Sequence, residues 1–357
     1  MTSKAFELAK LGNAYSDGAL SNRNLIINGG LTISQRYGTS ASNLGGSSVF
    51  SVDRFNCFGP AASSTSTGQQ VTDTPAGFKN SLKYTCGTGL SVTSGDYAQI
   101  QQTLEGNNTA HLKWGTSDAQ DIVVSFWVKS SLTGTFAFNI QNGGFSRSYV
   151  AQYQINAANT WEYKTITVAG DTSGTWATDN TASLRIIWDM GFGYGTTSTV
   201  DAWQAGDVHY VSGNVKVNET SGATFYLTGV QLEVGDTATP FEHRSYGQEL
   251  ALCQRYYEQI EYIAYSAVAM GHAYNTNSLH GPFYYNEKRA TPSISVNNGV
   301  MCYNSTTAQA PTTLGWHSAT KKSVNINPTG GMTFAANAAS FIIAGPSGLS
   351  VKIDAEL

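Results

Sequence analysis

Short runs of alternating apolar and polar residues dominate the chain from residue 24 onward. A period of two is typical of β-strands that bury one face. Gly, Asn, Asp and Ser separate the runs, and short strands at this spacing indicate an antiparallel β-sandwich. The last run of this sandwich ends before Pro240, and Tyr226, Val230 and Leu232 are predicted to share one of its faces.

The same alternation predicts which side chains point away from the core. Phe126 and Val128 face inward in one run, so the intervening Trp127 faces outward. Phe138 and Ile140 turn inward in the next run. The outward side chains are then predicted to form an amide-rich sheet surface that carries one aromatic ring, made of Trp127, Asn139, Gln141, Gln152 and Gln154.

The segment GVQLEVGDTATPFEHRSYGQELALCQRYYEQ, residues 229–259, changes from a strand pattern to a helix pattern after its proline. Ser245 is a plausible N-cap, and Gln248 follows it at the spacing of a capping box. Leu250, Cys253 and Tyr257 then recur at i, i+3 and i+7, which predicts an apolar stripe on a helix. We predict a connecting helix over 243–260.

The helix pattern divides the chain into domains. Residues 24–242 form the predicted sandwich, and residues 261–357 read as a smaller set of strands that suffices for a second β domain. At the other end, Leu8, Leu11 and Tyr15 are spaced for a short helix. Residues 1–23 are therefore interpreted as an N-terminal anchor.

Composition excludes several classes of function. The 357 residues carry a formal net charge of -4 without a cluster of Lys or Arg, so we expect no nucleic-acid partner. No window approaches the roughly 18 apolar residues of a membrane span, and the N-terminus lacks the apolar core of a signal peptide, so synthesis in a cytoplasm is expected. The 4 cysteines are far apart and are predicted to be small buried hydrophobes.

The outward amides and Trp127 suggest glycan binding. An aromatic face packs against the C–H edges of a sugar, and planar amides pair with its hydroxyls. Two other interpretations remain open: a neighbouring subunit covers this surface, or it supports a second layer of packing.

The residues of FEHRSYGQE invite an acid–base interpretation, because Glu242, His243, Arg244 and Glu249 lie close together in sequence. General acid–base catalysis also needs a cleft and a nucleophile, and no catalytic motif supplies them. We therefore expect no enzyme, and we expect these residues to anchor the connector through hydrogen bonds. Three histidines of the C-terminal region lack metal-ligand spacing to any partner and are interpreted as ordinary loop or strand residues: His272, His280 and His317.

Several segments resemble one protein family. NLIINGGLTISQR, SVDRF and above all the segment 229–259 resemble tail-fibre and receptor-binding proteins of tailed bacteriophages, and GPFYYNEKRATPSISV with the terminal DAEL resembles their distal domain. The resemblance covers nearly the whole chain from residue 24. It implies a jelly-roll sandwich like that of carbohydrate-binding modules, a connecting helix, a smaller C-terminal β domain and a homotrimer.

The resemblance also implies a possible structural Ca²⁺ between the first and last strands of the sandwich. The corresponding residues are Asn28, Asp53 and Glu233. Because a calcium site takes about six to eight oxygens, an alternative is a partly buried ion pair among Asp53, Arg54 and Glu233. No other cofactor is expected.

The leading hypothesis is a virion tail fibre that binds host surface polysaccharide or lipopolysaccharide by multivalent adhesion. Its N-terminus would contact other tail or capsid proteins, and a trimer would cover the stripes formed by Leu8, Leu11, Tyr15, Leu250, Cys253 and Tyr257. One alternative is a capsid or tail decoration protein without a receptor role. Another is a polysaccharide depolymerase, which needs two carboxylates about 5–10 Å apart and would release reducing ends.

Overall fold

The computed structural model describes residue 4 and residues 22–59, 65–297, 299–304, 307–335 and 338–357. The chain divides into two compact units, the first running to Glu249 and the second from Leu250 to Glu356. Strands pair antiparallel in the main sheets of both units, which confirms the predicted all-β class. The predicted N-terminal stripe of Leu8, Leu11 and Tyr15 lies outside the described residues.

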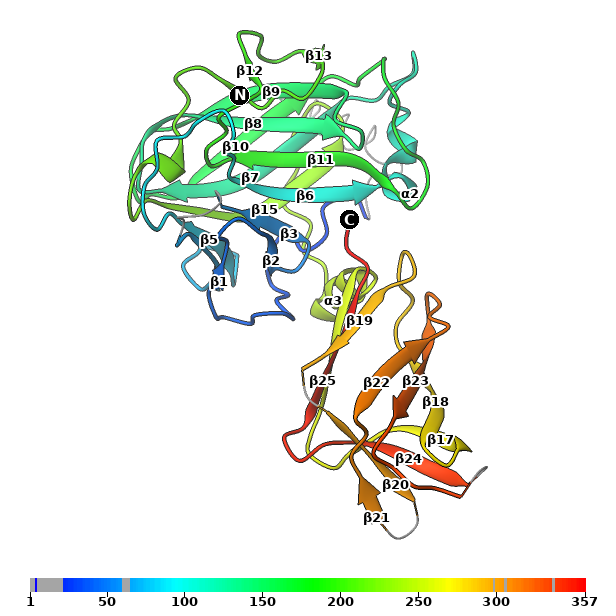
Figure 1. The fold of residues 1–357 in the computed structure, drawn as a ribbon. Helices are drawn as coiled ribbons and strands as arrows, with labels where there is room; N and C mark the ends of the chain where they lie inside the picture. Colours follow the sequence, from blue (N-terminus) through cyan, green and yellow to red (C-terminus); the bar gives the residue numbers. More distant parts are fainter. Residues whose placement is uncertain (1–3, 5–21, 60–64, 298, 305–306, 336–337) are drawn as a thin grey trace. The chain divides into compact units, whose positions relative to one another are not determined.

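The first unit is a sandwich of two sheets (Figure 1). In spatial order, the six-stranded sheet contains β1 (Ser42–Asn43), β4 (Thr67–Val71), β5 (Ser81–Thr85), β15 (Thr224–Val234), β7 (Ile122–Ser130) and β10 (Glu162–Val168). The seven-stranded sheet contains β13 (Trp203–Ala205), β9 (Arg147–Ile155), β8 (Gly134–Asn142), β11 (Ala182–Asp189), β6 (Gln99–Glu105), β3 (Phe55–Phe58) and β2 (Ser48–Val52). The remaining short elements of this unit are α2 (Gly106–Thr109), the 3-10 turns Ala110–Leu112 and Val217–Glu219, and the parallel pair β12 (Thr196–Thr197) and β14 (Tyr210–Val211).

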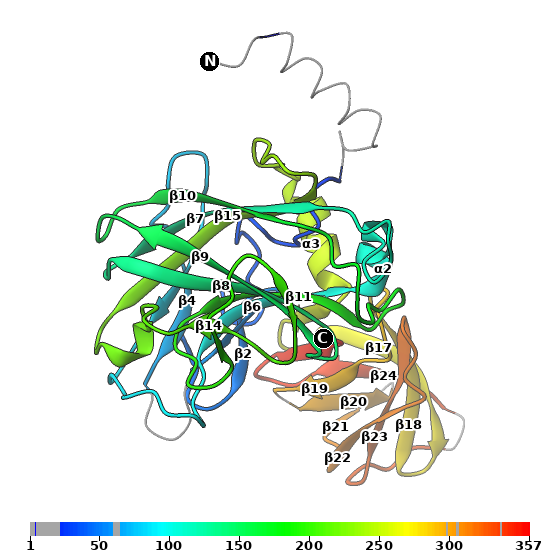
Figure 2. The ribbon, with the colours of Figure 1, turned by 90° about the horizontal axis from the view of Figure 1, so that it is seen from above.

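The hydrophobic core lies between these two sheets, which Figure 2 shows as separate layers. Phe126 on β7 and Phe138 on β8 are fully buried, as their alternation predicts. Trp188 on β11 meets Phe126 edge-on, with ring centroids 5.5 Å apart and an interplanar angle of 89°. Aromatic side chains from both sheets therefore fill the interior.

A β-bulge in β15 changes the predicted orientation of one side chain. The register against β7 shifts between Thr228 and Gln231, and Gly229 has φ +61° within the shift. Phe225 and Leu227 face the core before the bulge, and Val230 and Leu232 face it afterwards. The prediction that Tyr226 shares the face of Val230 and Leu232 is therefore wrong, because an extra residue inverts the alternation.

The connecting helix is present but shorter than predicted. Helix α3 (Tyr246–Gln254) begins directly after Ser245, whose hydroxyl accepts the N–H of Gln248 at 3.4 Å while the Gln248 side chain accepts the N–H of Ser245 at 3.2 Å. These two bonds confirm the predicted capping box. The helix ends before residue 260 because Tyr257 starts a strand, where it pairs with Asp354.

This geometry also corrects the predicted oligomerisation stripe. Cys253 and Tyr257 are buried, with exposed fractions of 0% and 2%, and Leu250 is half-buried. Two of the three side chains thus have their apolar surface covered within one copy of the chain. They do not need a second subunit to remove that surface from water.

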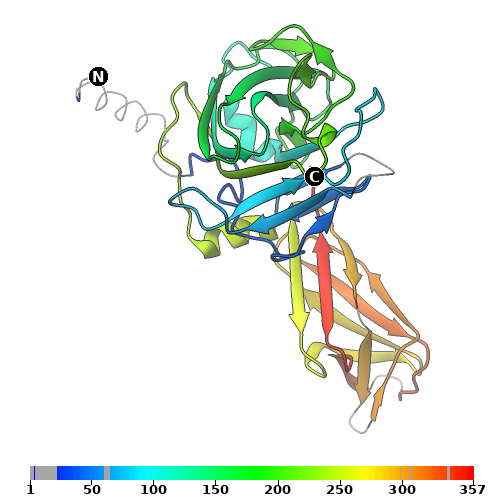
Figure 3. The same cartoon turned by 90° about the vertical axis from the view of Figure 1, so that its left-hand side faces the viewer.

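The second unit is a smaller sandwich. Its three-stranded sheet contains β16 (Tyr257–Tyr262), β25 (Leu349–Asp354) and β19 (Ser293–Val296), and Figure 3 shows β16 beside β25. Its seven-stranded sheet contains β21 (Thr307–Gln309), β20 (Val300–Asn304), β24 (Ala339–Ala344), β17 (Ala267–Asn275), β18 (Ser278–Tyr284), β23 (Ser323–Thr329) and β22 (Thr313–His317). Buried Phe283, Ile326, Ile342 and Val351 belong to the core of this unit.

Candidate functional site

The five predicted glycan-binding residues do not share one surface. Trp127 lies on β7 of the six-stranded sheet of the first unit, whereas the four amides lie on β8 and β9 of the seven-stranded sheet. Alternation predicts the face of each strand but not the sheet that the strand joins, so the grouping was wrong. Trp127 is also half-buried, and its ring lies 5.3 Å from the ring of Tyr163.

Two of the four amides are buried beneath a loop. Asn139 and Gln141 are both 0% exposed. The Asn139 side chain donates to the carbonyl of His209 at 3.1 Å, and that of Gln141 donates to the Asp207 carboxylate at 2.8 Å. Both side chains thus support a second layer of packing, the alternative left open by the sequence. On β9, Gln152 and Gln154 remain exposed, as predicted.

A row of polar side chains lies on the outer face of the same seven-stranded sheet, along β6, where Gln99 and Gln101 are half-buried and Thr103 is 5% exposed. The Gln99 amide donates to the Gln101 side chain at 3.0 Å, and Gln101 donates to the Thr103 hydroxyl at 2.8 Å. Ile100, between the two glutamines, points into the core. The neighbouring strands add Asn56 opposite Gln101 and Arg185 opposite Thr103. We call Asn56, Gln99, Gln101, Thr103 and Arg185 the amide strip.

Aromatic rings lie at one end of the amide strip. Phe58 pairs with Gln99 across β3 and β6. Its ring stacks on Tyr97 at a centroid distance of 4.1 Å and an interplanar angle of 8°. Tyr97 in turn meets Tyr194 edge-on at 6.2 Å. Burial raises the pKa of both tyrosines, so their hydroxyls are neutral donors at physiological pH.

Charged groups beside the strip are held in fixed positions. Asp207 pairs with His209 at 2.9 Å, and this hydrogen bond lowers the pKa of Asp207 against the opposing effect of burial. The guanidinium of Arg185 lies 4.0 Å above the ring of Phe145 and donates to the Gly143 carbonyl at 2.6 Å. Burial lowers the pKa of Arg185 from its ordinary value. The strip therefore offers one cation and several neutral hydrogen-bonding groups.

Sequence reasoning missed this strip although a signal was present. The run YAQIQQTLEG has the alternation of a strand, and this alternation places Gln99, Gln101 and Thr103 on one face. The contributions of Asn56 and Arg185 had no comparable signal, because pairing between β3, β6 and β11 joins segments far apart in the sequence.

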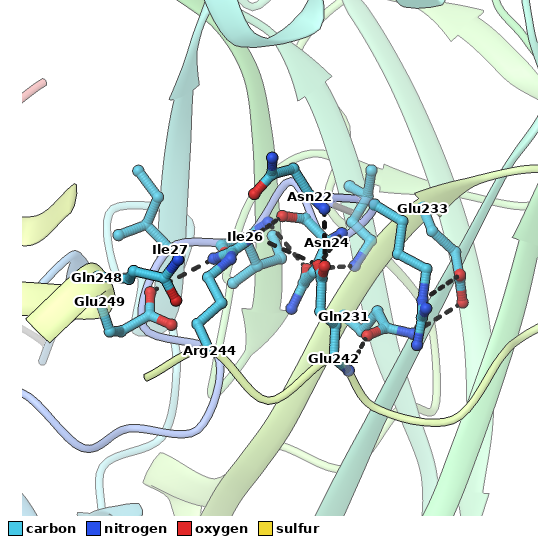
Figure 4. Close-up of polar contacts among 12 residues, drawn as sticks. Asn22, Asn24, Ile26, Ile27, Gln231, Glu233, Glu242, Arg244, Gln248 and Glu249 are labelled. Carbon is cyan, nitrogen blue, oxygen red and sulfur yellow. Dashed lines mark hydrogen bonds and ion pairs between the residues drawn. The ribbon is translucent and has the colours of Figure 1, made fainter. Parts of the chain in front are cut away.

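The acidic and basic residues of FEHRSYGQE form a tether within the first unit (Figure 4). Glu242 accepts the backbone N–H groups of Asn22 at 2.7 Å and Asn24 at 2.9 Å. Arg244 donates to the carbonyls of Asn24 and Ile26, and it pairs with Glu249 at 3.4 Å. These contacts agree with the predicted anchoring role.

Asn24 completes this tether by bridging two segments. Its side-chain oxygen accepts the N–H of Ile26 at 3.0 Å and that of Leu232 at 3.1 Å, and its amide donates to the Val230 carbonyl at 3.1 Å. The segment from Asn22 to Asn28 is thereby fixed along β15. These side chains are engaged in structural hydrogen bonds.

The predicted calcium ligands do not fit a cation site. The Asn28 side chain donates to the carbonyls of Ile33 and Asp53, both at 2.8 Å. The Asp53 carboxylate accepts the backbone N–H of Gln35 at 2.9 Å, and the Glu233 carboxylate accepts that of Thr239 at 2.8 Å. Glu233 also pairs with Arg23 at 3.6 Å. These carboxylates are thus surrounded by N–H donors, whereas a hard cation requires converging oxygens.

The described part of the chain contains no group of three or more His, Cys, Asp or Glu side chains placed to hold a metal ion. None of its helices has the length and apolarity that crossing a bilayer requires.

Comparison with known proteins finds no matching family model and no matching curated relative. Among solved structures, the enzymatically active domain of tailspike protein 4 from bacteriophage CBA120 is 12% identical with a TM-score of 0.31, and the match covers 60% of this chain but only 22% of that one. A CBM4 structure is 14% identical with a TM-score of 0.32, and the match covers 58% of this chain and 98% of that one. The family 11 carbohydrate-binding module of a Clostridium thermocellum cellulase is 13% identical with a TM-score of 0.28, with 57% and 99% covered. Because these identities and TM-scores are low, any functional assignment depends on the residues of this chain.

Proposed function

We propose that this protein is a tail-fibre or receptor-binding protein of a tailed bacteriophage, and that it binds host surface glycans through the amide strip. The observation that carries glycan binding is the ladder Gln99–Gln101–Thr103 beside the stacked rings of Phe58 and Tyr97. The resemblance of residues 229–259 to phage fibre proteins supports the virion role.

The chemistry of the strip suits a sugar chain. An amide donates and accepts in one plane, so it pairs with vicinal hydroxyls without a net charge. Gln99 and Gln101 are half-buried, so their orientation is restrained by the ladder before a ligand arrives. The neighbouring aromatic rings offer apolar faces to the C–H groups of a pyranose. This arrangement supports binding, and we propose a role without catalysis.

Because a single glycan contact is weak, firm adhesion to a cell surface requires several linked copies of the chain, and we propose a homotrimer. An exposed apolar row on the second unit supports an interface: Met270 pairs with Phe341, which pairs with Tyr303. These side chains are 71%, 44% and 36% exposed. Adjacent apolar groups of this kind mark interaction surfaces. Three linked copies would raise avidity over single-site affinity by about 10²–10⁴-fold.

Binding of the purified chain to an array of bacterial surface polysaccharides tests the glycan proposal. Gln101→Ala combined with Phe58→Ala should reduce the signal by at least about tenfold, since two contacts worth about 1 kcal/mol each are lost. Gln152→Ala, which removes an exposed amide on the same sheet but outside the strip, is the matched control. Equal binding by the double variant and the control would reject the strip as the site.

Two further measurements separate the accompanying proposals. Light scattering should give three times the 38.1 kDa mass of one chain, and Met270→Lys should lower that mass. A monomeric wild-type chain would contradict the trimer. Incubation with bound polysaccharide should release no reducing ends, and their release would indicate a depolymerase. Labelling of intact virions at fibre tips would support the fibre role, whereas labelling over the capsid would favour decoration.

A further inference from the structure

A polar hollow lies on the seven-stranded sheet of the second unit. It shares no residue with the amide strip, which belongs to the first unit. Its volume is about 470 Å³. Side chains from β17, β18, β22 and β23 and from the β17–β18 turn line it: Tyr274, Asn275, Asn277, Ser278, His280, His317, Asn327 and Thr329.

Strand register explains why two histidines from distant segments reach this hollow. His272 on β17 pairs directly with His280 on β18, and their ring centroids are 6.2 Å apart. Toward the edge of the same sheet, Asn327 on β23 pairs with Gly315 on β22. His317 lies two residues after Gly315 on the same face of β22.

Gly315 provides the room for the second imidazole. A Cβ atom at this position would lie 3.2 Å from Nε2 of His317 and 3.3 Å from the carbonyl oxygen of Asn327. The imidazole of His317 therefore folds back over Gly315 toward Asn327. At the opposite side of the hollow, the ring of Tyr274 stacks on His280 with a centroid distance of 4.8 Å and an interplanar angle of 14°.

The hollow combines imidazoles with neutral polar groups. The titratable side chains facing it are Tyr274 from β17, His280 from β18 and His317 from β22, with His272 adjacent to His280, and β23 contributes none. The described lining residues include no Asp, Glu, Lys or Arg. Burial, and then repulsion by His272 and His317, lowers the pKa of His280. An anion placed among these rings would meet no repelling carboxylate from the lining.

One buried oxygen in the hollow lacks a donor. The side-chain Oδ1 of Asn327 is shielded from solvent and accepts no hydrogen bond within the described part of the chain. A buried acceptor without a donor is unfavourable by about 1–3 kcal/mol, so a ligand hydroxyl that displaces the covering side chains and donates to it would be favoured. Tyr274, which is 64% exposed, offers a flat apolar face at the opposite side of the hollow.

We propose that this hollow binds an acidic sugar, whose carboxylate lies against His280 and His317 and whose hydroxyl donates to Oδ1 of Asn327. The ring of Tyr274 packs against the pyranose. This site goes beyond the proposed glycan binding by the amide strip, because it lies in the other unit and selects ligands by charge. It does not depend on that strip.

Binding of the carboxylate should depend on pH. An anion within about 4–6 Å favours the protonated imidazole and so raises the pKa of His280 in the complex. Binding then takes up a proton, so affinity rises as pH falls through the histidine range. One unit of pKa difference corresponds to about a tenfold change in affinity.

The test uses the full chain and two matched probes, a trigalacturonic acid and the neutral galactotriose, titrated by calorimetry at pH 7.5 and pH 5.5. We expect the acidic trisaccharide to bind at least about tenfold more tightly at the lower pH, and the neutral probe to show no such gain. His280→Gln should reduce the pH dependence, because it removes one of the two imidazoles beside the carboxylate while keeping a hydrogen-bonding side chain. The control is His111→Gln, at an exposed histidine of the first unit, which should leave the pH dependence unchanged.

Two further variants test the geometry. Asn327→Asp should abolish binding of the acidic probe by adding a like charge, and Gly315→Val should weaken it by displacing His317. Circular dichroism checks that each variant folds. Absence of binding by the wild-type chain, equal affinity for both probes, or an unchanged pH profile in His280→Gln would overturn the proposal. Gln101→Ala with Phe58→Ala should leave the pH-dependent signal intact, so failure of the two sites can be distinguished.

Discussion

Replacing Arg244 tests whether the tether of the first unit stabilises the fold. Arg244→Ala removes donors from the carbonyls of Asn24 and Ile26 and the cationic partner of Glu249. The arginine and glutamate side chains are only 10% and 11% exposed, so solvent replaces these interactions incompletely. Neither carbonyl can be satisfied by alanine.

The magnitude follows from the contacts that are lost. Two hydrogen bonds are worth about 1 kcal/mol each, and a carboxylate left without its partner adds about 1–2 kcal/mol. We expect the free energy of unfolding to fall by about 3–4 kcal/mol, and Tm to fall by about 6–15 °C for a unit of this size. Arg244→Lys retains the charge but not the planar fork, so its loss should be about half as large.

Urea denaturation followed by tryptophan fluorescence measures this change. Six of the 7 tryptophans precede Glu249, with Trp316 alone in the second unit, so the signal reports mainly the first unit. Lys79→Ala, at an exposed position of the same unit, controls for removal of a positive charge. If Arg244→Ala changed the unfolding free energy no more than Lys79→Ala, the tether would be a consequence of the fold and not a cause of its stability.

Three other predictions concern the first unit and the cysteines. Gly229→Val should lower the free energy of unfolding by about 2–4 kcal/mol, because φ at this position is +61° and a Cβ atom would lie 2.6 Å from Phe78. Gly144→Val, where a Cβ meets open space, is the control, and equal urea midpoints for the two variants would contradict the bulge argument. Burial raises the pKa of Asp189 from 3.8 to about 7, so the stabilisation by its protonated carboxyl group should be lost as pH rises from 4 to 7. Asp189→Asn should flatten the urea midpoint across this pH range, and parallel profiles for the wild type and the variant would refute the prediction. Burial raises the pKa of Cys57 and Cys302 to about 12, so their thiols should resist alkylation at pH 8 in the native chain and react only in denaturant. Rapid labelling of the native chain would show instead that these thiols are accessible.

Local features could be predicted from the sequence. The inward direction of Phe126 and Phe138 depends only on the period of a strand, and both are buried. The capping box depends on two residues three positions apart, Ser245 and Gln248, and both of its bonds form. The cysteines are buried, as their prediction as small buried hydrophobes requires. Strand direction and the capping box depend on residues that are neighbours in the chain.

A local departure from the ideal strand already limits this reasoning. Gly229 permits a bulge in β15, and one extra residue turns Tyr226 away from the face predicted for it. The sequence contains the glycine but not the register, which depends on how β15 pairs with β7. Prediction of side-chain direction therefore weakens with every irregular residue along a strand.

The composition of each surface depends on contacts between distant segments. Trp127 and Gln152 belong to strands of different sheets, and the segment around His209 covers Asn139, although alternation assigns all three outward directions. In the second unit, His280 and His317 line one hollow because β18 and β22 both pair with β23. Alternation along a strand is a property of the backbone and can be read from one segment. The choice of pairing partner depends on packing energies summed over the whole domain, so the surfaces that could bind a ligand arise only when the chain has folded.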